Sequence, residues 1–561
     1  MVSLNNKPTS VSNGRGFKRW FAALAIALIV FGAGLRLIHL PTAILGGDEV
    51  YSALRISGSS FEQAYGELAD GKVHSASQWQ AHLSPQPGSS WRDTVRALAR
   101  EAPEHPPLFY LLSRQWQRCF GSTNLQRRLL PALIGLALIP AMALLAYELW
   151  SSTWIALWTA LLISINPFHI LYAKELREYS LWSVLIALSA YLLAKAFKHN
   201  TRATWLAYGL ALSALLYTHL FSLALAMAWA ALGLLKPWRS RLPGLWLSTG
   251  LALLSYAPWL WMAGQGSMLR RGTNLWTAET LSWPLLAWNW GLNASRIWLD
   301  LDPGGRLIGG DSLLLTGLRA LAVFGSALAA LACFFWLSRQ PNPSAKAIVF
   351  SMLASSALPL VAADLLLGGS RSAIARYQIP AYLALALVVA WGLAQLSRNQ
   401  RSLALVLATV LITLNLSSSW RALAATGWWS KQGSLDQPLI ARAIQGFDRP
   451  LIVAEGYLPR LLSLSSELNG EVGLQVLADP QDLDAAPCGY SDVLLYRPTQ
   501  RWRGIGAQRL LTTANRFPYL PAVSDHSRIW LSLLERSPAG ANEARAVNSE
   551  NQNSCVRQAT P

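Results

Sequence analysis

Two adjacent carboxylates, Asp48 and Glu49, follow closely on a long apolar segment at residues 20–38. A charge beside hydrocarbon is costly, so carboxylates in this position need a pairing partner or a function. A carboxylate held at that height can act as a general base towards a hydroxyl group. The same pair can instead cap a helix, because Asp is a favoured N-cap residue.

Other polar residues that could bind a substrate or take part in a reaction lie between later apolar stretches. They are His105, Glu175, His219, Arg376 and Tyr377. An arginine can bind a phosphate through two parallel hydrogen bonds, so Arg376 is a candidate anion ligand. Purely structural roles stay open as alternatives. Glu175 can form a local ion pair, His105 can end a turn, and His219 can pack in the interior. A metal site with Asp48, Glu49 and a histidine is conceivable, but the spacing requires none, so we expect no metal and no cofactor.

The composition is typical of a membrane protein with many spans. Of 561 residues, 53% are hydrophobic and only 14% are charged, whereas a soluble domain has roughly 25% charged residues. Windows without any Asp, Glu, Lys or Arg, such as 129–147, 203–235 and 242–264, are long enough for the ~20 residues of a span. The basic N-terminus and the first apolar run lack a cleavage site, so we expect an uncleaved first span.

Short basic loops alternate with the apolar stretches and set the predicted topology. The window 203–235 is too long for one span, so we divide it at residues 217–221, "YTHLF". About eleven transmembrane helices result. The predicted spans are 20–39, 128–149, 153–170, 180–197, 203–218, 220–235, 243–263, 311–337, 346–366, 377–397 and 402–418.

This topology predicts a mostly α-helical polytopic membrane protein with a small extracytoplasmic α/β domain after it. Residues 1–19 are expected in the cytoplasm, and residues 20–419 form the membrane module with a large outside loop at 40–127. An amphipathic stretch at 108–120 within that loop suits the membrane interface. Residues 420–535 contain short strand-like runs and form the α/β domain, and residues 536–561 are polar and expected to be disordered.

Basic residues in two outside loops depart from the preference of positive charge for the inside. Arg127 and Arg128 end the first outside loop, and Arg376 lies in a later one. Arg127 and Arg128 are expected to extend to the interface from a helix end. Arg376 is equally compatible with that interpretation and with binding an anion.

The net charge of +18 does not indicate nucleic acid. From residue 420 onward the chain has 14 Lys and Arg against 13 Asp and Glu, so the excess lies in the membrane part. No basic run alternates with aromatic residues, and we expect no nucleic-acid partner. The four cysteines fit no zinc site, although Cys488 and Cys555 can pair if their domain lies outside the cytoplasm.

One chemistry uses acids, a histidine and an arginine at an outer membrane surface without a nucleotide. A sugar linked to a lipid phosphate is already activated and needs only a base for the acceptor hydroxyl. Cations stabilise the departing phosphate. One carboxylate then suffices for inversion at the anomeric carbon.

Six motifs in order make the chain resemble the C-type glycosyltransferase superfamily of polyprenyl-phosphate-sugar-dependent enzymes. It is most similar to bacterial protein-mannosyltransferase-like and lipopolysaccharide-core transferases, with aminoarabinose transferases as relatives. The resemblance covers residues 17–397. The motifs are "GGDEVYSA", "EHPPLFYLLSRQW…FG", "RRLLPALIGLALIP", "INPFHILYAKELREYSLW", "YTHLFSL" and "RYQIPAYLALAL".

The resemblance implies that Asp48 is the catalytic base and that Glu49 is the second acid of the pair. It places Glu175 in an acidic position of the second loop, and His105 and Arg376 at positions facing the lipid phosphate. Tyr377 and His219 belong to the same predicted substrate-binding set. Lys174 and Glu178 depart from the usual pattern, which changes the expected contacts with sugar or acceptor.

The sequence therefore predicts an inverting glycosyltransferase of the bacterial inner membrane with its site on the extracytoplasmic face. Its partners are a polyprenyl-phosphate-linked sugar, the lipid bilayer, and a glycan, lipid or protein acceptor. The main alternative is a transporter or flippase of a lipid-linked sugar, which would keep charges near the bilayer midplane and show inverted repeats. A membrane-anchored binding protein ranks last, because the tail has no site motif.

Overall fold

The computed structural model describes most of the chain. Its described residues are 11–265, 275–300, 313–339, 342–425, 427–479, 482, 489–499, 501–502, 511–514 and 531–536. Cys488 and Cys555, whose pairing the sequence left open, and the polar tail from residue 537 lie outside these ranges. The following account concerns the described residues.

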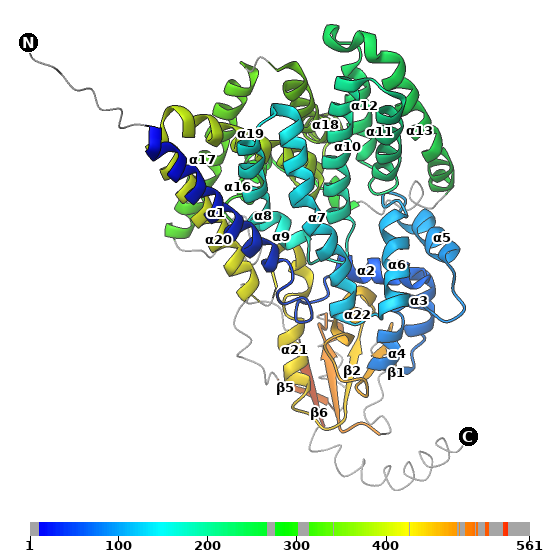
Figure 1. The fold of residues 1–561 in the computed structure, drawn as a ribbon. Coiled ribbons are helices and arrows are strands. Elements are labelled where there is room, and N and C mark those ends of the chain that lie inside the picture. Colours follow the sequence, from blue (N-terminus) through cyan, green and yellow to red (C-terminus); the bar gives the residue numbers. More distant parts are fainter. Residues whose placement is uncertain are drawn as a thin grey trace, which may run out of the picture.

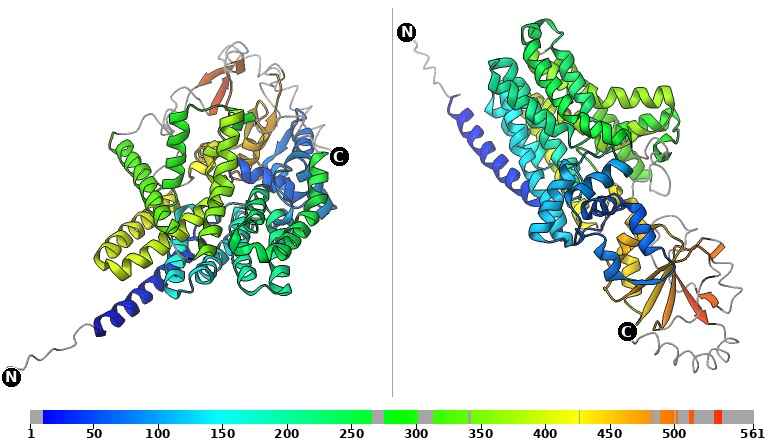
Figure 2. Two further views of the ribbon diagram at one scale, coloured as in Figure 1. Left: turned by 90° about the horizontal axis from the view of Figure 1, so that it is seen from above. Right: turned by 90° about the vertical axis from the view of Figure 1, so that its right-hand side faces the viewer.

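The apolar segments form helices that lie side by side in one bundle (Figures 1 and 2). The longer members are α1 (Val11–Leu35), α7 (Asn124–Trp150), α10 (Tyr179–His199), α13 (Leu242–Gly264), α17 (Leu313–Ser338), α18 (Pro343–Leu367), α19 (Ile379–Asn399) and α20 (Arg401–Ala424). The shorter ones are α8 (Thr153–Ser164), α9 (Pro167–Tyr172), α11 (Arg202–Leu216), α12 (Ser222–Leu232), η1 (Lys236–Arg241), α15 (Leu275–Ala278), α16 (Trp283–Ser295), η2 (Arg371–Ala373) and η3 (Ala375–Gln378).

Five helices among the described residues are long and apolar enough to cross a membrane, judged by length and composition. They are Asn124–Trp150, Tyr179–His199, Pro343–Leu367, Ala375–Asn399, which includes η3 and α19, and the helix that begins at Arg401. Four further apolar helices are shorter: Trp20–Leu35, Thr153–Ser164, Ser222–Leu232 and Arg319–Leu328. The total of eleven spans stays a prediction.

The predicted span at residues 153–170 is not a single helix. Instead of one helix over 153–170, α8 ends at Ser164 and α9 begins at Pro167. Pro167 has no backbone N–H to continue a helix, and the Asn166 side chain accepts from the His169 backbone N–H at 3.1 Å to start a new one. The predicted break at 217–221 is confirmed, because α11 ends at Leu216 and α12 begins at Ser222.

The first loop folds into helices beside the bundle. They are α2 (Gly47–Ser57), α3 (Phe61–Leu68), α4 (Ala76–Ala81), α5 (Trp91–Glu101) and α6 (Leu108–Phe120). Helix α6 confirms the amphipathic helix expected at 108–120. Its buried face includes Phe109, Tyr110 and Ser113.

The C-terminal region forms a sheet with helices, at the end of the molecule nearest the first loop (Figure 1). After η4 (Trp429–Ser434) come α21 (Gln437–Ile444), β2 (Pro450–Ala454), α22 (Leu458–Ser465), β3 (Gly473–Val476), β4 (Asp492–Tyr496), β5 (Leu511–Ala514) and β6 (Leu531–Arg536). Strand β2 is central and runs parallel to both β3 and β4, while β6 is antiparallel to β4 and β5.

The first loop adds its own strand to this sheet, which the sequence did not indicate. Strand β1 (Val73–Ser75) pairs antiparallel with β3, and the full order is β1-β3-β2-β4-β6-β5. Side chains join the two regions as well. Gln80 donates to the Ser465 carbonyl at 2.6 Å, and Ser463 donates to the Leu45 carbonyl at 2.6 Å. The first loop and the C-terminal region therefore pack as one unit.

Candidate functional site

Helix α2 presents the two adjacent carboxylates. Gly46 precedes the helix in an extended conformation, and its backbone N–H donates to Glu49 Oε2 at 3.0 Å. This contact caps the start of the helix through the Glu49 side chain. Because neighbours on a helix do not share a face, Asp48 and Glu49 point in different directions.

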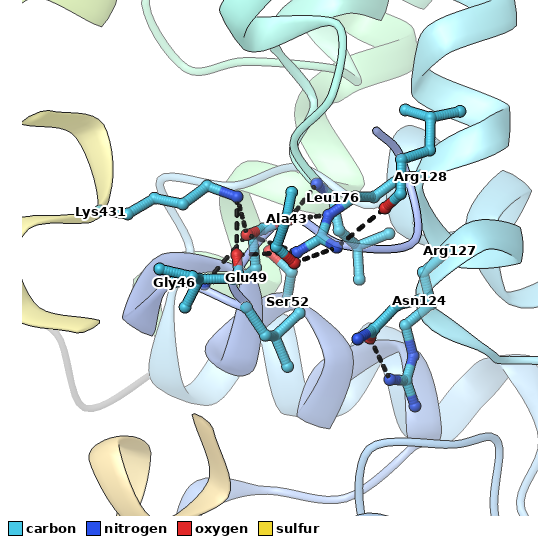
Figure 3. A network of polar contacts seen from close by, with 12 residues as sticks. Ala43, Gly46, Glu49, Ser52, Asn124, Arg127, Arg128, Leu176 and Lys431 are labelled. Atoms are coloured by element: carbon cyan, nitrogen blue, oxygen red, sulfur yellow. Dashed lines mark hydrogen bonds and ion pairs between the residues drawn. The ribbon is translucent and has the colours of Figure 1, made fainter. Parts of the chain in front are cut away.

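Glu49 lies at the centre of a buried network of polar contacts (Figure 3). Lys431 Nζ donates to its Oε2 at 2.8 Å, and Arg128 Nε donates to its Oε1 at 3.2 Å. The Leu176 backbone N–H donates to the same Oε1 at 3.0 Å. With the Gly46 contact, both oxygens of Glu49 accept hydrogen bonds from groups in four separate parts of the chain. Glu49 therefore holds the start of the first loop against the rest of the protein.

The charges around Glu49 keep it ionised. Burial alone would raise its pKa, but the adjacent Arg128 and Lys431 cations hold the pKa below its usual range. Arg128 also donates to the carbonyls of Ala43 at 2.6 Å and Ile44 at 2.8 Å. The expectation that Arg128 extends to the membrane interface is wrong, because its side chain is fully buried and bound to Glu49.

Arg127 also departs from that expectation. It is buried and donates to the Leu83 carbonyl at 2.9 Å. Figure 3 shows it beside Asn124 and separate from the Glu49 network. Both arginines bind backbone carbonyls of the first loop, so packing of that loop over the start of α7 explains their position.

Asp48 contrasts with Glu49 because its carboxylate is accessible. Its side chain is 46% exposed, and Oδ2 lies 3.4 Å from Arg376 Nη2. Arg376 itself is 20% exposed. Desolvation would raise the pKa of Asp48, but Arg376 and then Arg177 outweigh it and lower the pKa. Asp48 is therefore an ionised, reachable carboxylate with an arginine beside it.

A second buried network lies next to Asp48. Arg177 Nη1 donates to the Asp48 carbonyl at 3.3 Å, and Nη2 lies 3.1 Å from His105 Nε2. Glu178 Oε1 lies 2.8 Å from His105 Nδ1, and Tyr110 donates to Glu178 Oε2 at 3.1 Å. Because an arginine can only donate, Nε2 is the acceptor and Nδ1 carries the proton towards Glu178.

Glu178 supplies the negative charge that balances Arg177. Burial would raise the pKa of Glu178, but Arg177 and then His105 hold it well below the usual range. The sequence identified Glu178 as an acid of this loop that departs from a family pattern, and it gave Arg177 no role beyond local pairing with Glu175. The adjacent pair of opposite charges in "ELREYS" was the available signal.

His219 lies near His105, and Tyr377 lies near His219. The His219 ring is stacked on Trp182 with centroids 4.0 Å apart, and its Nδ1 accepts from the Phe221 backbone N–H at 3.2 Å. Burial lowers the pKa of His219 to about 3, so it is neutral with its proton on Nε2. Its ring centroid lies 6.4 Å from those of both His105 and Tyr377.

Glu175 lies close enough to Glu49 and Lys431 to interact with their charges. Its side chain is buried and its pKa is raised to about 7, first by burial and then by the charge of Glu49, with Lys431 opposing the shift. Its neighbour Lys174 is also buried and donates to the Ile38 carbonyl at 2.8 Å. A contact between Glu175 and substrate stays a prediction.

Glu175 should make folding stability depend on pH. A raised folded pKa means that the folded state binds more protons than the unfolded state between pH 4.5 and about 7, so stability falls as pH rises through that window. Replacing Glu175 by Gln removes this dependence. The free energy of unfolding of Glu175→Gln, taken relative to that of the unsubstituted protein, should increase by up to ~3 kcal/mol between pH 4.5 and pH 8. Thermal unfolding of the purified variants at both pH values tests this, and an equal difference at both would contradict it.

The fold thus brings Asp48, Arg376, His105, Tyr377 and His219 to one region, and Glu49 and Glu175 are buried nearby. An ionised carboxylate open to solvent can accept a proton, and the adjacent guanidinium can bind an anion. The residues that the sequence analysis did not assign to this site, Arg128, Arg177 and Lys431, hold the backbone around Asp48.

No protein-family model and no curated protein matches the chain. Among solved structures it is similar to AglB, an oligosaccharyltransferase from Archaeoglobus fulgidus in complex with an inhibitory peptide and a dolichol-phosphate. Identity is 14% over 80% of this chain and 64% of that one, with a TM-score of 0.46. Another Archaeoglobus fulgidus oligosaccharyltransferase structure, with Zn and sulfate, is 12% identical over 79% and 62%, with a TM-score of 0.44.

ArnT from Cupriavidus metallidurans, bound to undecaprenyl phosphate, is 15% identical over 92% of this chain and 98% of that one, with a TM-score of 0.40. The chain spans about three fifths of the length of the archaeal oligosaccharyltransferases, 62% and 64%. All three TM-scores lie below 0.5.

Proposed function

We propose that this protein is a membrane glycosyltransferase that moves a sugar from a polyprenyl-phosphate-linked donor to an acceptor hydroxyl, with Asp48 as the base. The observation that carries the proposal is the contrast within the acidic pair. Glu49 is buried and bound on both oxygens, whereas Asp48 is 46% exposed and lies 3.4 Å from Arg376. An accessible carboxylate beside an arginine that can bind a phosphate is what this transfer requires.

The reaction balances with these two groups. Asp48 takes the proton of the acceptor hydroxyl as the hydroxyl oxygen forms a bond to the anomeric carbon. The bond between that carbon and the phosphate oxygen breaks, and its electron pair leaves with the polyprenyl phosphate. Arg376 stabilises the phosphate, whose charge grows by one. Attack opposite to the leaving group inverts the anomeric configuration.

The ion pair between Asp48 and Arg376 must open during this reaction. Donor phosphate competes with the Asp48 carboxylate for the Arg376 guanidinium, so binding of the donor releases the base. Arg177 keeps the Asp48 backbone in place through its 3.3 Å contact with the Asp48 carbonyl. In this proposal His105, His219, Glu175 and Tyr377 line the substrates.

The proposed location is the extracytoplasmic face of a bacterial inner membrane. Helix α1 contains the apolar stretch Trp20–Leu35, and Asp48 follows it after 12 residues. The donor's isoprenoid stays in the bilayer while its phosphate lies at headgroup depth, so the anomeric carbon is presented close to the end of such a helix. The C-terminal unit lies on the same side, because it packs on the first loop.

Arg376→Lys tests the phosphate role. A lysine keeps the charge but cannot donate two parallel hydrogen bonds to a phosphate, so we expect transfer to fall by at least about tenfold with an increased KM for the donor. The matched control is Arg371→Lys, because Arg371 lies in the same loop but pairs with Asp364 at 3.2 Å. Full transfer by Arg376→Lys in reconstituted vesicles would contradict this placement of the phosphate.

A further inference from the structure

Aromatic rings lead away from Asp48 along the first loop. Tyr51 lies one helical turn after Asp48, on the same face of α2. Its ring centroid is 5.7 Å from that of Phe61, which is 6.1 Å from that of Tyr65. Tyr65 is 42% exposed. These rings therefore connect the proposed base with the outer surface of α3.

The C-terminal unit completes this row of rings. Tyr457 is 59% exposed and lies three residues after the end of β2. The preceding Gly456 has φ +113, and a Cβ there would lie 3.4 Å from the Tyr65 hydroxyl, so the two regions approach closely. Tyr51 has a pKa raised to about 12, first by burial and then by the nearby Tyr457. We call Tyr51, Phe61, Tyr65 and Tyr457 the aromatic surface.

The position of Tyr457, beyond the carboxyl end of strand β2, is a second and independent indication of a ligand site. The chain leaves β2 towards β3 on one side, while β4 lies on the other side of β2 and leads away to β5 and β6. This is a topological switch point. Ligands of such sheets bind outside the carboxyl ends of the strands at that point. Thr499, after β4, donates to Glu455, after β2, and so connects the two strand ends.

The chemistry of this surface suits a saccharide. Tyr51, Tyr65 and Tyr457 each carry a phenol hydroxyl as well as a ring face, so a sugar ring can place its C–H groups on a ring face while its hydroxyls form hydrogen bonds. Guanidinium groups lie over two of the rings, with Arg55 5.3 Å from Tyr51 and Arg460 4.9 Å from Tyr457. Arg55 is buried, whereas Arg460 is half-buried and can provide further donors for sugar oxygens and for acidic substituents.

We infer that the aromatic surface binds the acceptor and that the acceptor is an oligosaccharide. The inference rests on the proposed function, because it places the acceptor hydroxyl at Asp48. The sugar chain then extends from Asp48 over α2 and α3 to the carboxyl edge of β2. The C-terminal unit thereby selects the acceptor, and the membrane helices hold the donor.

Binding should be measured without turnover, in the full chain carrying Asp48→Asn. The probes are pooled oligosaccharides released from the cell envelope of a strain lacking this gene, and tryptic peptides of the same envelope. Saturation-transfer NMR reports which pool contacts the protein. We expect saccharide signals, and about tenfold weaker saccharide binding when Tyr65→Ala and Tyr457→Ala are added together.

Two controls keep the result interpretable. The double variant Tyr65→Phe and Tyr457→Phe retains the ring faces and should bind within about threefold of its parent. Trp91→Ala removes another exposed ring of the first loop, 57% exposed on α5, and should bind normally. Binding of peptides in place of saccharides, unchanged binding by the double alanine variant, or binding of neither pool would overturn the inference. Sugar transfer by the protein with Asp48 intact is measured separately, so loss of this inference leaves the proposed function open to its own test.

Discussion

Asp48→Asn should abolish sugar transfer while the protein still folds and binds its donor. Asparagine keeps the size and polarity of the side chain but cannot accept the hydroxyl proton. Loss of a positioned general base lowers turnover by roughly 100-fold to 10,000-fold. The single-turnover rate with a radiolabelled polyprenyl-phosphate sugar measures the effect.

The same variant should bind donor more tightly than the unsubstituted protein. In the structure Asp48 occupies Arg376 at 3.4 Å, so removing its charge removes a competitor of the donor phosphate. Asp70→Asn is the matched control, because Asp70 is an acid of the same loop that pairs with His74 and Lys72. Normal turnover by Asp48→Asn would show that the base lies elsewhere, with Glu175 as the next candidate.

Glu49→Gln should destabilise the protein rather than remove a catalytic group. The substitution leaves Arg128 and Lys431 buried without their shared counter-charge. Breaking a buried ion pair from one side costs about 3–5 kcal/mol. We expect a lower melting temperature and a loss of activity that follows the loss of folded protein.

A second substitution separates charge from packing in this network. Lys431→Met removes one of the two cations while keeping an unbranched side chain of similar length. In the Glu49→Gln background it should restore part of the melting temperature, because one unpaired charge is gone. Equal melting temperatures for Glu49→Gln and the unsubstituted protein would contradict the anchoring role of Glu49.

Much of the helical framework follows from local sequence signals. The amphipathic helix at 108–120 and the break at 217–221 coincide with α6 and with the turn before α12. These features depend on hydrophobic periodicity and length, which a single sequence displays. The break at Asn166 and Pro167 carried its own signal, an N-cap residue followed by proline, but the continuous apolar run suggested one span.

The polar network was less predictable because its partners are far apart in the chain. Lys431 lies 382 residues from Glu49, and Arg128 lies 79 residues from it. Nothing local in "WWSKQG" indicates a buried lysine. Strand β1 was missed for the same reason, since three residues gain strand geometry only by pairing with β3. The nearness of Asp48 and Arg376, in contrast, is compatible with the topology, which placed both on one side.

The most direct test of the central claim follows the sugar itself. The purified protein is reconstituted in vesicles with radiolabelled polyprenyl-phosphate sugars and the pooled glycans, lipids and proteins of an envelope from a strain lacking the gene. The account predicts that label leaves the polyprenyl lipid and becomes covalently attached to an acceptor, with one polyprenyl phosphate released for each sugar transferred. Label that crosses the vesicle membrane while still attached to its polyprenyl phosphate would contradict the account and identify a flippase.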